Sequence, residues 1–151
     1  MNRREFVTRA AGMAAATAAA ARAGWAGPAA SAIPRRALGK TGVEVPVLIL
    51  GGVVAMKYAP TRSFHPAELA QAALDAGITY FDTAPSYGDG QSERNYGEVL
   101  VTRRKEVFLA CKTGSRSYDG TLRSVEASLQ RLRTDRLDLL MLHRPDYLMD
   151  A

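Results

Sequence analysis

The sequence predicts an α/β fold in which crossover helices join parallel strands, and it favours a (β/α)8 barrel over a doubly wound sheet. Apolar runs of strand length alternate with segments whose apolar residues recur at helical spacing. Strands that follow one another with a helix between them are typical of parallel pairing. A doubly wound dinucleotide fold would carry Gly-x-Gly-x-x-Gly after its first strand, and that motif does not follow the first apolar run.

A hairpin and a strand are expected first. The turn Gly-Lys-Thr-Gly at residues 39–42 lies between two short extended runs, which is typical of a hairpin. The apolar run Val-Pro-Val-Leu-Ile-Leu at residues 45–50 then predicts one strand, ended by Gly51 and Gly52. The hairpin therefore precedes the alternating part of the chain.

Three helices and three further strands are expected after this point. Pro66 at a helix start and apolar residues at steps of three and four predict the first helix, and Ser92 is able to cap the second. The expected elements are, in order, a helix over 63–78, a strand over 79–82, a helix over 92–100, a strand over 106–112, a helix over 120–133 and a strand over 137–143. Four parallel strands are thus expected.

The strand count falls short of a closed barrel, which has eight strands and about 250 residues. We therefore expect the 151 residues to hold half of a barrel, truncated after about four β/α units, as an N-terminal fragment of a longer protein. The first and fourth strands would expose unpaired backbone groups, so such a half is expected to aggregate, to pair with itself or to need the remaining portion.

Residues 1–34 are expected to be an export signal followed by a tether of small residues. The segment has a basic head and an alanine-rich apolar middle. Arg3 and Arg4 are followed by Phe6 in a pattern that resembles the twin-arginine signal. The apolar run over 10–21 is too short to span a bilayer of about 30 Å, which disfavours a membrane anchor.

The signal resemblance implies a partner and a location. The partner would be the twin-arginine translocase, which moves proteins that have already folded in the cytoplasm. The mature chain would be periplasmic or otherwise extracytoplasmic, with no stable membrane span. Cleavage could follow Ala23, Ala26 or Ala32, and the folded domain is expected over 35–151.

The charge pattern argues against a nucleic-acid partner. The formal net charge is +5, but residues 1–26 hold four arginines and one glutamate, so most of the excess lies in the N-terminal segment. The remainder has no run of five like charges and no basic stripe interleaved with aromatic residues.

The single cysteine, Cys111, predicts neither a disulfide nor a metal site, because it has no companion at suitable spacing. It follows an apolar run, so we expect a small buried residue. A reactive thiol beside Lys112 is the alternative.

Three successive apolar runs each end in one titratable residue. The runs end in Asp82, Lys112 and His143, and Tyr87 lies on the loop just after Asp82. Carboxyl ends of barrel strands line one mouth, where active sites lie, so these four side chains are expected to converge. Taken singly, Asp82 could cap a turn, Lys112 could be a solvated strand end and His143 a rim histidine. Their coincidence at three equivalent positions favours a site.

The four residues suit one kind of chemistry. A lysine ammonium within about 4–6 Å of a phenol stabilises the phenolate, and an aspartate paired to the lysine keeps it charged and oriented. Tyr87 could then donate a proton near neutral pH, while His143 holds the same carbonyl oxygen. Reduction of a carbonyl group by hydride is a reaction that needs such a set.

These residues resemble the aldo-keto reductase family. Residues 77–100 are similar to the family's signature around its catalytic aspartate and tyrosine, residues 107–114 to the segment that bears its lysine, and residues 120–145 to the helix and strand that lead to its histidine. The hairpin resembles the one that plugs the base of the family's barrel. The resemblance runs from about residue 35 to the end.

The resemblance implies a (β/α)8 barrel of the aldo-keto reductase type that reduces aldehydes and ketones with NADPH, or less often with NADH. Tyr87 would be the proton donor, Lys112 and Asp82 its tuning pair, and His143 the residue that orients a small carbonyl substrate.

Cofactor contacts also follow from the resemblance. Gly52 and Val53 match a segment whose backbone approaches the nicotinamide, beside Asp82. Ile49 stands where the family commonly has glycine, and Tyr96 replaces a frequent leucine in a packing position. Most cofactor contacts in the family come from the second half of the barrel, so the 151-residue chain is not expected to turn over by itself.

Two other functions remain open. A Schiff-base aldolase or lyase on the same barrel would use Lys112 as its nucleophile, although the Asp-Tyr-Lys-His set argues against it. Channel-associated β subunits also resemble the family, so a non-catalytic, redox-sensing partner is the third interpretation, which the export signal disfavours.

Overall fold

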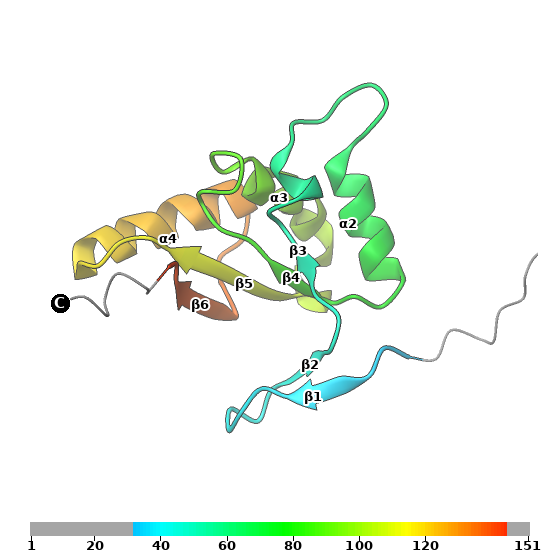
Figure 1. Cartoon of the computed structure of the whole chain (residues 1–151), viewed down its shortest axis with the longest axis horizontal. Coiled ribbons are helices and arrows are strands. Elements are labelled where there is room, and N and C mark those ends of the chain that lie inside the picture. The colour runs from blue at the N-terminus through cyan, green and yellow to red at the C-terminus, as the bar shows by residue number, and fades with distance from the viewer. Residues whose placement is uncertain (1–31, 145–151) are drawn as a thin grey trace, which may run out of the picture. The chain divides into compact units, whose positions relative to one another are not determined.

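Four parallel strands form one sheet in the order β3-β4-β5-β6, and an antiparallel pair, β1-β2, precedes them in a computed structural model that describes residues 32–144 (Figure 1). The strands are β1 (Arg35–Ala37), β2 (Glu44–Pro46), β3 (Leu50–Gly51), β4 (Tyr80–Asp82), β5 (Phe108–Thr113) and β6 (Leu139–Leu142). The hairpin and the four parallel strands are therefore confirmed. The expected export signal and tether lie outside the described residues, except for residues 32–34.

Three long helices connect the parallel strands. The helical segments are the short η1 (Ala55–Lys57), α2 (Pro66–Asp75), α3 (Gln91–Arg103), the short η2 (Arg104–Glu106) and α4 (Tyr118–Leu132). The helix α3 contacts both α2 and α4, and the three long helices lie on one side of the sheet, away from the hairpin (Figure 1). The expected α/β alternation is confirmed for these units. In the described part of the chain, none of the helices is both long and apolar enough to cross a membrane.

The apolar run at residues 45–50 does not form the single strand that was expected. Its first residues pair with β1 and its last residue pairs with β4, while Val47, Leu48 and Ile49 belong to neither ladder and are about half exposed. A strand forms only where its backbone groups find a partner, and the partner changes within this run. The prediction from hydrophobicity alone was wrong for this reason.

Ser92 does not cap α3. The helix begins one residue earlier, at Gln91, and its cap is Gly90, whose φ of 76° is left-handed. The Ser92 hydroxyl is instead buried and lies 2.9 Å from the hydroxyl of Thr83, just after β4. A buried hydroxyl needs a hydrogen-bond partner, and this pair ties the start of α3 to the end of β4.

Two apolar clusters cover the two faces of the sheet. The helix-side cluster includes Phe81 and Leu109 from the sheet and residues from all three long helices. The hairpin-side cluster consists of Val45, Tyr80 and Ala110, with Leu38, Phe108, Leu139 and Met141 packed against it. Successive residues of a strand point to opposite faces, which accounts for this division. The hairpin therefore packs against part of the sheet face on which Tyr80 lies.

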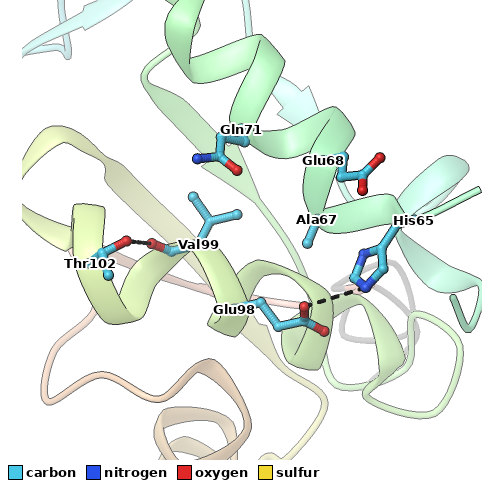
Figure 2. A pocket seen from close by; sticks show the side chains of 7 residues that line it. All are labelled: His65, Ala67, Glu68, Gln71, Glu98, Val99 and Thr102. Carbon is cyan, nitrogen blue, oxygen red and sulfur yellow. Dashed lines mark hydrogen bonds and ion pairs between the residues drawn. The ribbon is translucent and has the colours of Figure 1, made fainter.

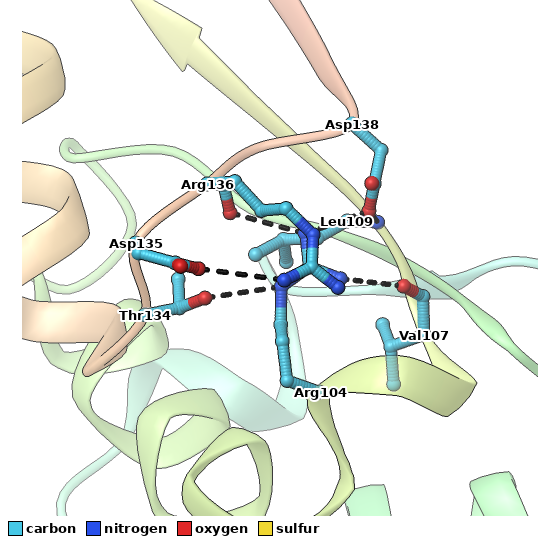
Figure 3. A network of polar contacts seen from close by, with 7 residues as sticks. All are labelled: Arg104, Val107, Leu109, Thr134, Asp135, Arg136 and Asp138. Carbon is cyan, nitrogen blue, oxygen red and sulfur yellow. Dashed lines mark hydrogen bonds and ion pairs between the residues drawn. The ribbon is translucent and has the colours of Figure 1, made fainter.

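One arginine, Arg104, forms hydrogen bonds to residues that precede β5 and β6. Arg104, with a side chain 10% exposed, donates to Asp138 Oδ2 at 2.8 Å, to Thr134 Oγ1 at 3.1 Å and to the backbone oxygens of Val107 and Arg136 (Figure 3). The same Asp138 oxygen accepts from the backbone N–H of Leu109 at 2.7 Å. This group, the Arg104 clasp, joins the end of α3 to the segment that enters β6.

Candidate active site

Asp82, Lys112 and His143 lie on the hairpin-side face of the sheet, at the carboxyl ends of three neighbouring strands. Each lies two residues after a residue that belongs to the hairpin-side cluster or packs against it, namely Tyr80, Ala110 and Met141. Residues two apart in a strand share a face, so all three side chains lie on the face of Tyr80 and Ala110, toward the carboxyl ends of the strands. The backbone N–H of His143 donates to the oxygen of Thr113 at 2.9 Å, which extends the β5-β6 pairing to the histidine itself.

Lys112 and Asp82 form an ion pair. Lys112 Nζ lies 2.6 Å from Asp82 Oδ1 and 3.1 Å from the backbone oxygen of Thr83, and the two side chains are 13% and 23% exposed. Partial burial strengthens the attraction compared with a surface pair. The ammonium is thereby held at a fixed place over the end of β4.

Tyr87 reaches the same place because of a tight turn. Gly88, Asp89 and Gly90 all have left-handed backbones, with φ of 61°, 52° and 76°. Glycine is needed at the first of these positions for a second reason, because a Cβ on Gly88 would collide with the backbone oxygen of Lys57. The turn reverses the chain into α3 and leaves Tyr87 facing the strand ends.

The tyrosine lies between the lysine and the histidine. Lys112 Nζ is 5.0 Å from the centre of the Tyr87 ring, and the Tyr87 and His143 rings are 5.7 Å apart at 84°. Ser86 Oγ lies 3.4 Å from Nδ1 of His143. All four residues expected at the mouth are thus brought together.

The environment of His143 favours its neutral form. Burial lowers the pKa of His143 below its ordinary value, the charges of Lys112 and Arg144 lower it further, and Asp82 opposes them. A neutral imidazole has one donor and one acceptor nitrogen. It can therefore hold a hydrogen-bonded partner without adding a charge.

A pocket of about 450 Å³ opens beside these residues and is lined by Val53, Ser86, Tyr87, Gly114, His143 and Arg144. Its volume falls in the range of about 300–1,000 Å³ that is typical of small-molecule sites. Val53, 47% exposed, gives it an apolar wall opposite polar groups. Such a wall suits the face of a planar ring, so the residues present fit a nicotinamide next to a small carbonyl compound.

Gly52 has a packing role that is visible in the structure. It is buried, its N–H donates to the oxygen of Asp82 at 2.7 Å, and a Cβ there would collide with Ser92 and with that same oxygen. Gly52 therefore fixes the end of β3 against the end of β4. Its expected contact with a cofactor stays a prediction.

A second pocket, of about 290 Å³, lies between α2 and α3 (Figure 2). Figure 2 shows that its lining comes from the helices and from the residue before α2: His65, Ala67, Glu68, Gln71, Glu98, Val99 and Thr102. His65 Nε2 is 3.6 Å from Glu98 Oε2. None of the strand-end residues lines it, so it is separate from the candidate site. Within residues 32–144, no cluster of three or more acidic, histidine or cysteine side chains is placed to hold a metal ion.

A buried carboxylate near the site was not predicted. Glu93 is fully buried on α3, and its Oε2 accepts from Arg131 Nε at 2.5 Å while its Oε1 accepts from Cys111 Sγ at 3.4 Å. Burial, with Glu93 adding to it, raises the pKa of the Cys111 thiol to about 12. The expectation of a buried cysteine is confirmed, and a reactive thiol is disfavoured because the thiolate is the nucleophile.

Two other α3 residues hold the end of β3 and the segment after it. The Tyr96 hydroxyl donates to the backbone oxygen of Leu50 at 2.8 Å, and its ring stacks on Phe81 at 4.8 Å. Asn95 Nδ2 donates to the backbone oxygens of Met56 and Tyr58 at 2.7 and 2.8 Å. The one sequence feature that could have indicated these contacts is the polar group that each residue carries next to the apolar positions of the helix.

Comparisons with known proteins agree with this arrangement. The model of a family described as the aldo/keto reductase family matches residues 47–150. The chain is 37% identical over 123 residues to the aldo-keto reductase YhdN of Bacillus subtilis, covering 72% of this chain and 37% of that protein. It is 36% identical over 129 residues to the 6-dehydroglucose reductase of Novosphingobium aromaticivorans, covering 75% of this chain and 42% of that protein.

A solved structure shares both sequence and fold. The aldo-keto reductase of Klebsiella pneumoniae in complex with NADP and acetate is 33% identical, with a TM-score of 0.58 over 66% of this chain and 36% of that one. The chain therefore spans about two fifths of the length of the relatives it matches.

Proposed function

The chain belongs to the aldo/keto reductase family, and we propose that the protein reduces aldehydes and ketones to alcohols with NADPH, or with NADH. One observation carries the proposal, namely that Asp82, Tyr87, Lys112 and His143 meet at the carboxyl ends of the parallel strands. The Klebsiella relative contains NADP, and the Novosphingobium relative is named a reductase, which supports the cofactor and the reaction class.

In this proposal Tyr87 donates the proton that the carbonyl oxygen takes up. The Lys112 ammonium, 5.0 Å from the ring centre, stabilises the phenolate that remains, and Asp82 holds that ammonium in place. NADPH, when bound, supplies the hydride that reaches the carbonyl carbon. The substrate leaves as an alcohol, and Tyr87 remains as a phenolate until it takes up a proton again.

His143 orients the carbonyl group. In the tautomer in which Ser86 donates to Nδ1, the hydrogen of the imidazole is on Nε2 and can be donated to the carbonyl oxygen. The lowered pKa of His143 supports a neutral ring in this role. Val53, Gly52 and Asp82 are proposed to lie against the nicotinamide.

The proposal includes a closed (β/α)8 barrel for the whole enzyme and export through the twin-arginine translocase. The four parallel strands leave both outer edges of the sheet, at β3 and β6, without a strand partner among the described residues, as a barrel segment would. The arginine pair and alanine-rich stretch in residues 1–34 support the export signal.

The contacts of Lys112 weigh against the Schiff-base alternative. Its Nζ donates to a carboxylate and to a backbone oxygen, which suits an ammonium. A Schiff-base nucleophile must be a neutral amine.

The test uses the whole protein that the gene encodes, NADPH deuterated at the transferred position, and a panel of simple aldehydes. We expect NADPH to be consumed and the deuterium to appear on the carbinol carbon of the alcohol. A product without deuterium, or an aldehyde trapped on Lys112 by borohydride in the absence of NADPH, would contradict the proposal.

A further inference from the structure

We propose that Arg144 forms an anion subsite in the pocket beside Tyr87 and His143, so that the preferred carbonyl substrates of this protein carry a carboxylate. The inference rests on the proposed function and narrows its substrate class.

The position of Arg144 in the pocket is the first observation. Arg144 lines the same pocket of about 450 Å³ as Tyr87 and His143, and it is the only permanently charged side chain among the six lining residues. No carboxylate belongs to this lining. A substrate whose carbonyl oxygen is held between Tyr87 and His143 would therefore present its remaining atoms to a cation.

The guanidinium of Arg144 is uncompensated in the described part of the chain. No carboxylate of residues 32–144 lies within 4.0 Å of its nitrogens, whereas Asp82, the carboxylate of the site, is paired with Lys112 at 2.6 Å. The positive charge of Arg144 also acts on its surroundings, because it lowers the pKa of His143. An unpaired guanidinium is well suited to a carboxylate, since its planar donors match the two oxygens.

The backbone at Arg144 is held in an uncommon conformation. Its φ is 54°, in the left-handed region that non-glycine residues seldom adopt. Arg116 Nη2 donates to the backbone oxygen of Arg144 at 2.9 Å and to that of His143 at 3.0 Å. The loop after β5 thus fixes the turn after β6, and with it the direction in which the Arg144 side chain leaves the chain.

The location favours substrate over cofactor as the partner of this arginine. A cofactor phosphate is separated from the nicotinamide by a ribose, whereas Arg144 shares one small pocket with the proposed proton donor. We therefore expect the Michaelis constant for NADPH to be independent of Arg144.

The experiment measures kcat/KM of the whole encoded protein for para-carboxybenzaldehyde and for benzaldehyde, which share a reacting group and differ in charge. We expect the wild type to prefer the carboxylated aldehyde, increasingly so at low ionic strength. Arg144→Gln should lower the ratio of the two kcat/KM values about tenfold, the size expected for a partly exposed charge-assisted hydrogen bond. Arg144→Lys, which keeps the charge, should retain part of the preference.

The matched control is Arg123→Gln, which removes an equal charge from an exposed position on α4 and should leave the ratio unchanged. If NADPH is consumed with benzaldehyde but the carboxylated aldehyde is not preferred, the anion subsite is refuted and the proposed function stands. The subsite is also refuted if Arg144→Gln leaves the ratio of the two kcat/KM values unchanged or raises the KM for NADPH. No consumption with either aldehyde would overturn the proposed function and the subsite with it.

Discussion

Replacing Arg131 with methionine should destabilise the fold more than replacing its partner Glu93 with glutamine, because the two side chains differ in burial. The Glu93 side chain is 0% exposed and that of Arg131 is 26% exposed. Without the charge of Glu93, Arg131 can turn toward solvent. Without Arg131, the carboxylate stays enclosed, with only the weak donor Cys111 Sγ at 3.4 Å.

The magnitude follows from the burial of Glu93, because removing one partner of a buried ion pair leaves an uncompensated charge enclosed and costs about 3–5 kcal/mol. We expect Arg131→Met to lower the free energy of unfolding by about 3–4 kcal/mol, as for other broken buried pairs. Glu93→Gln, which keeps the shape and one hydrogen bond, should cost about 1–2 kcal/mol.

The assay is urea unfolding of the whole encoded protein, followed by circular dichroism. The double variant should cost less than the sum of the single variants, since no unpaired charge remains buried. Arg123→Met, on the exposed face of the same helix, is the control. A larger cost for Glu93→Gln than for Arg131→Met would refute the reasoning.

Three further substitutions each remove one contact of the fold or of the site. Tyr96→Phe keeps the ring stack and loses the hydrogen bond to the Leu50 oxygen, so urea unfolding should show a loss of about 1 kcal/mol, and no loss would contradict that contact. Arg104→Met leaves the partners of the Arg104 clasp unpaired and should cost about 3 kcal/mol by the same assay, whereas a cost below about 1 kcal/mol would mean that the clasp is a surface ion pair. In an NMR titration of His143 in the whole encoded protein, Arg144→Gln should raise the pKa of His143, since a neighbouring positive charge is removed; an unchanged or lower pKa would contradict this expectation.

The candidate site was predictable from sequence because its residues mark the ends of apolar runs. Asp82, Lys112 and His143 each follow a run of strand length, and parallel strands bring such ends to one edge. Tyr87 could be added because it lies only a few residues after Asp82. Element type and order were visible for the same reason, since alternating apolar patterns record which face each residue presents.

The contacts that support the site were not predictable, because they join residues far apart in the chain. Glu93 and Arg131 are 38 residues apart, and Tyr96 and Leu50 are 46 apart. Ser92 was expected to cap a helix, as serine often does near a helix start, but burial gave its hydroxyl a tertiary partner. Local sequence shows that a residue is polar, but it does not show which distant group that residue will meet.

The most direct test of the account is the rate of hydride transfer in Tyr87→Phe, measured in a single turnover together with NADPH affinity. If Tyr87 donates the proton, hydride transfer should slow by about 10²- to 10⁴-fold while NADPH binds as in the wild type. Tyr118→Phe, at a tyrosine 78% exposed on α4, should change neither quantity. An unchanged rate of hydride transfer in Tyr87→Phe would contradict the central claim.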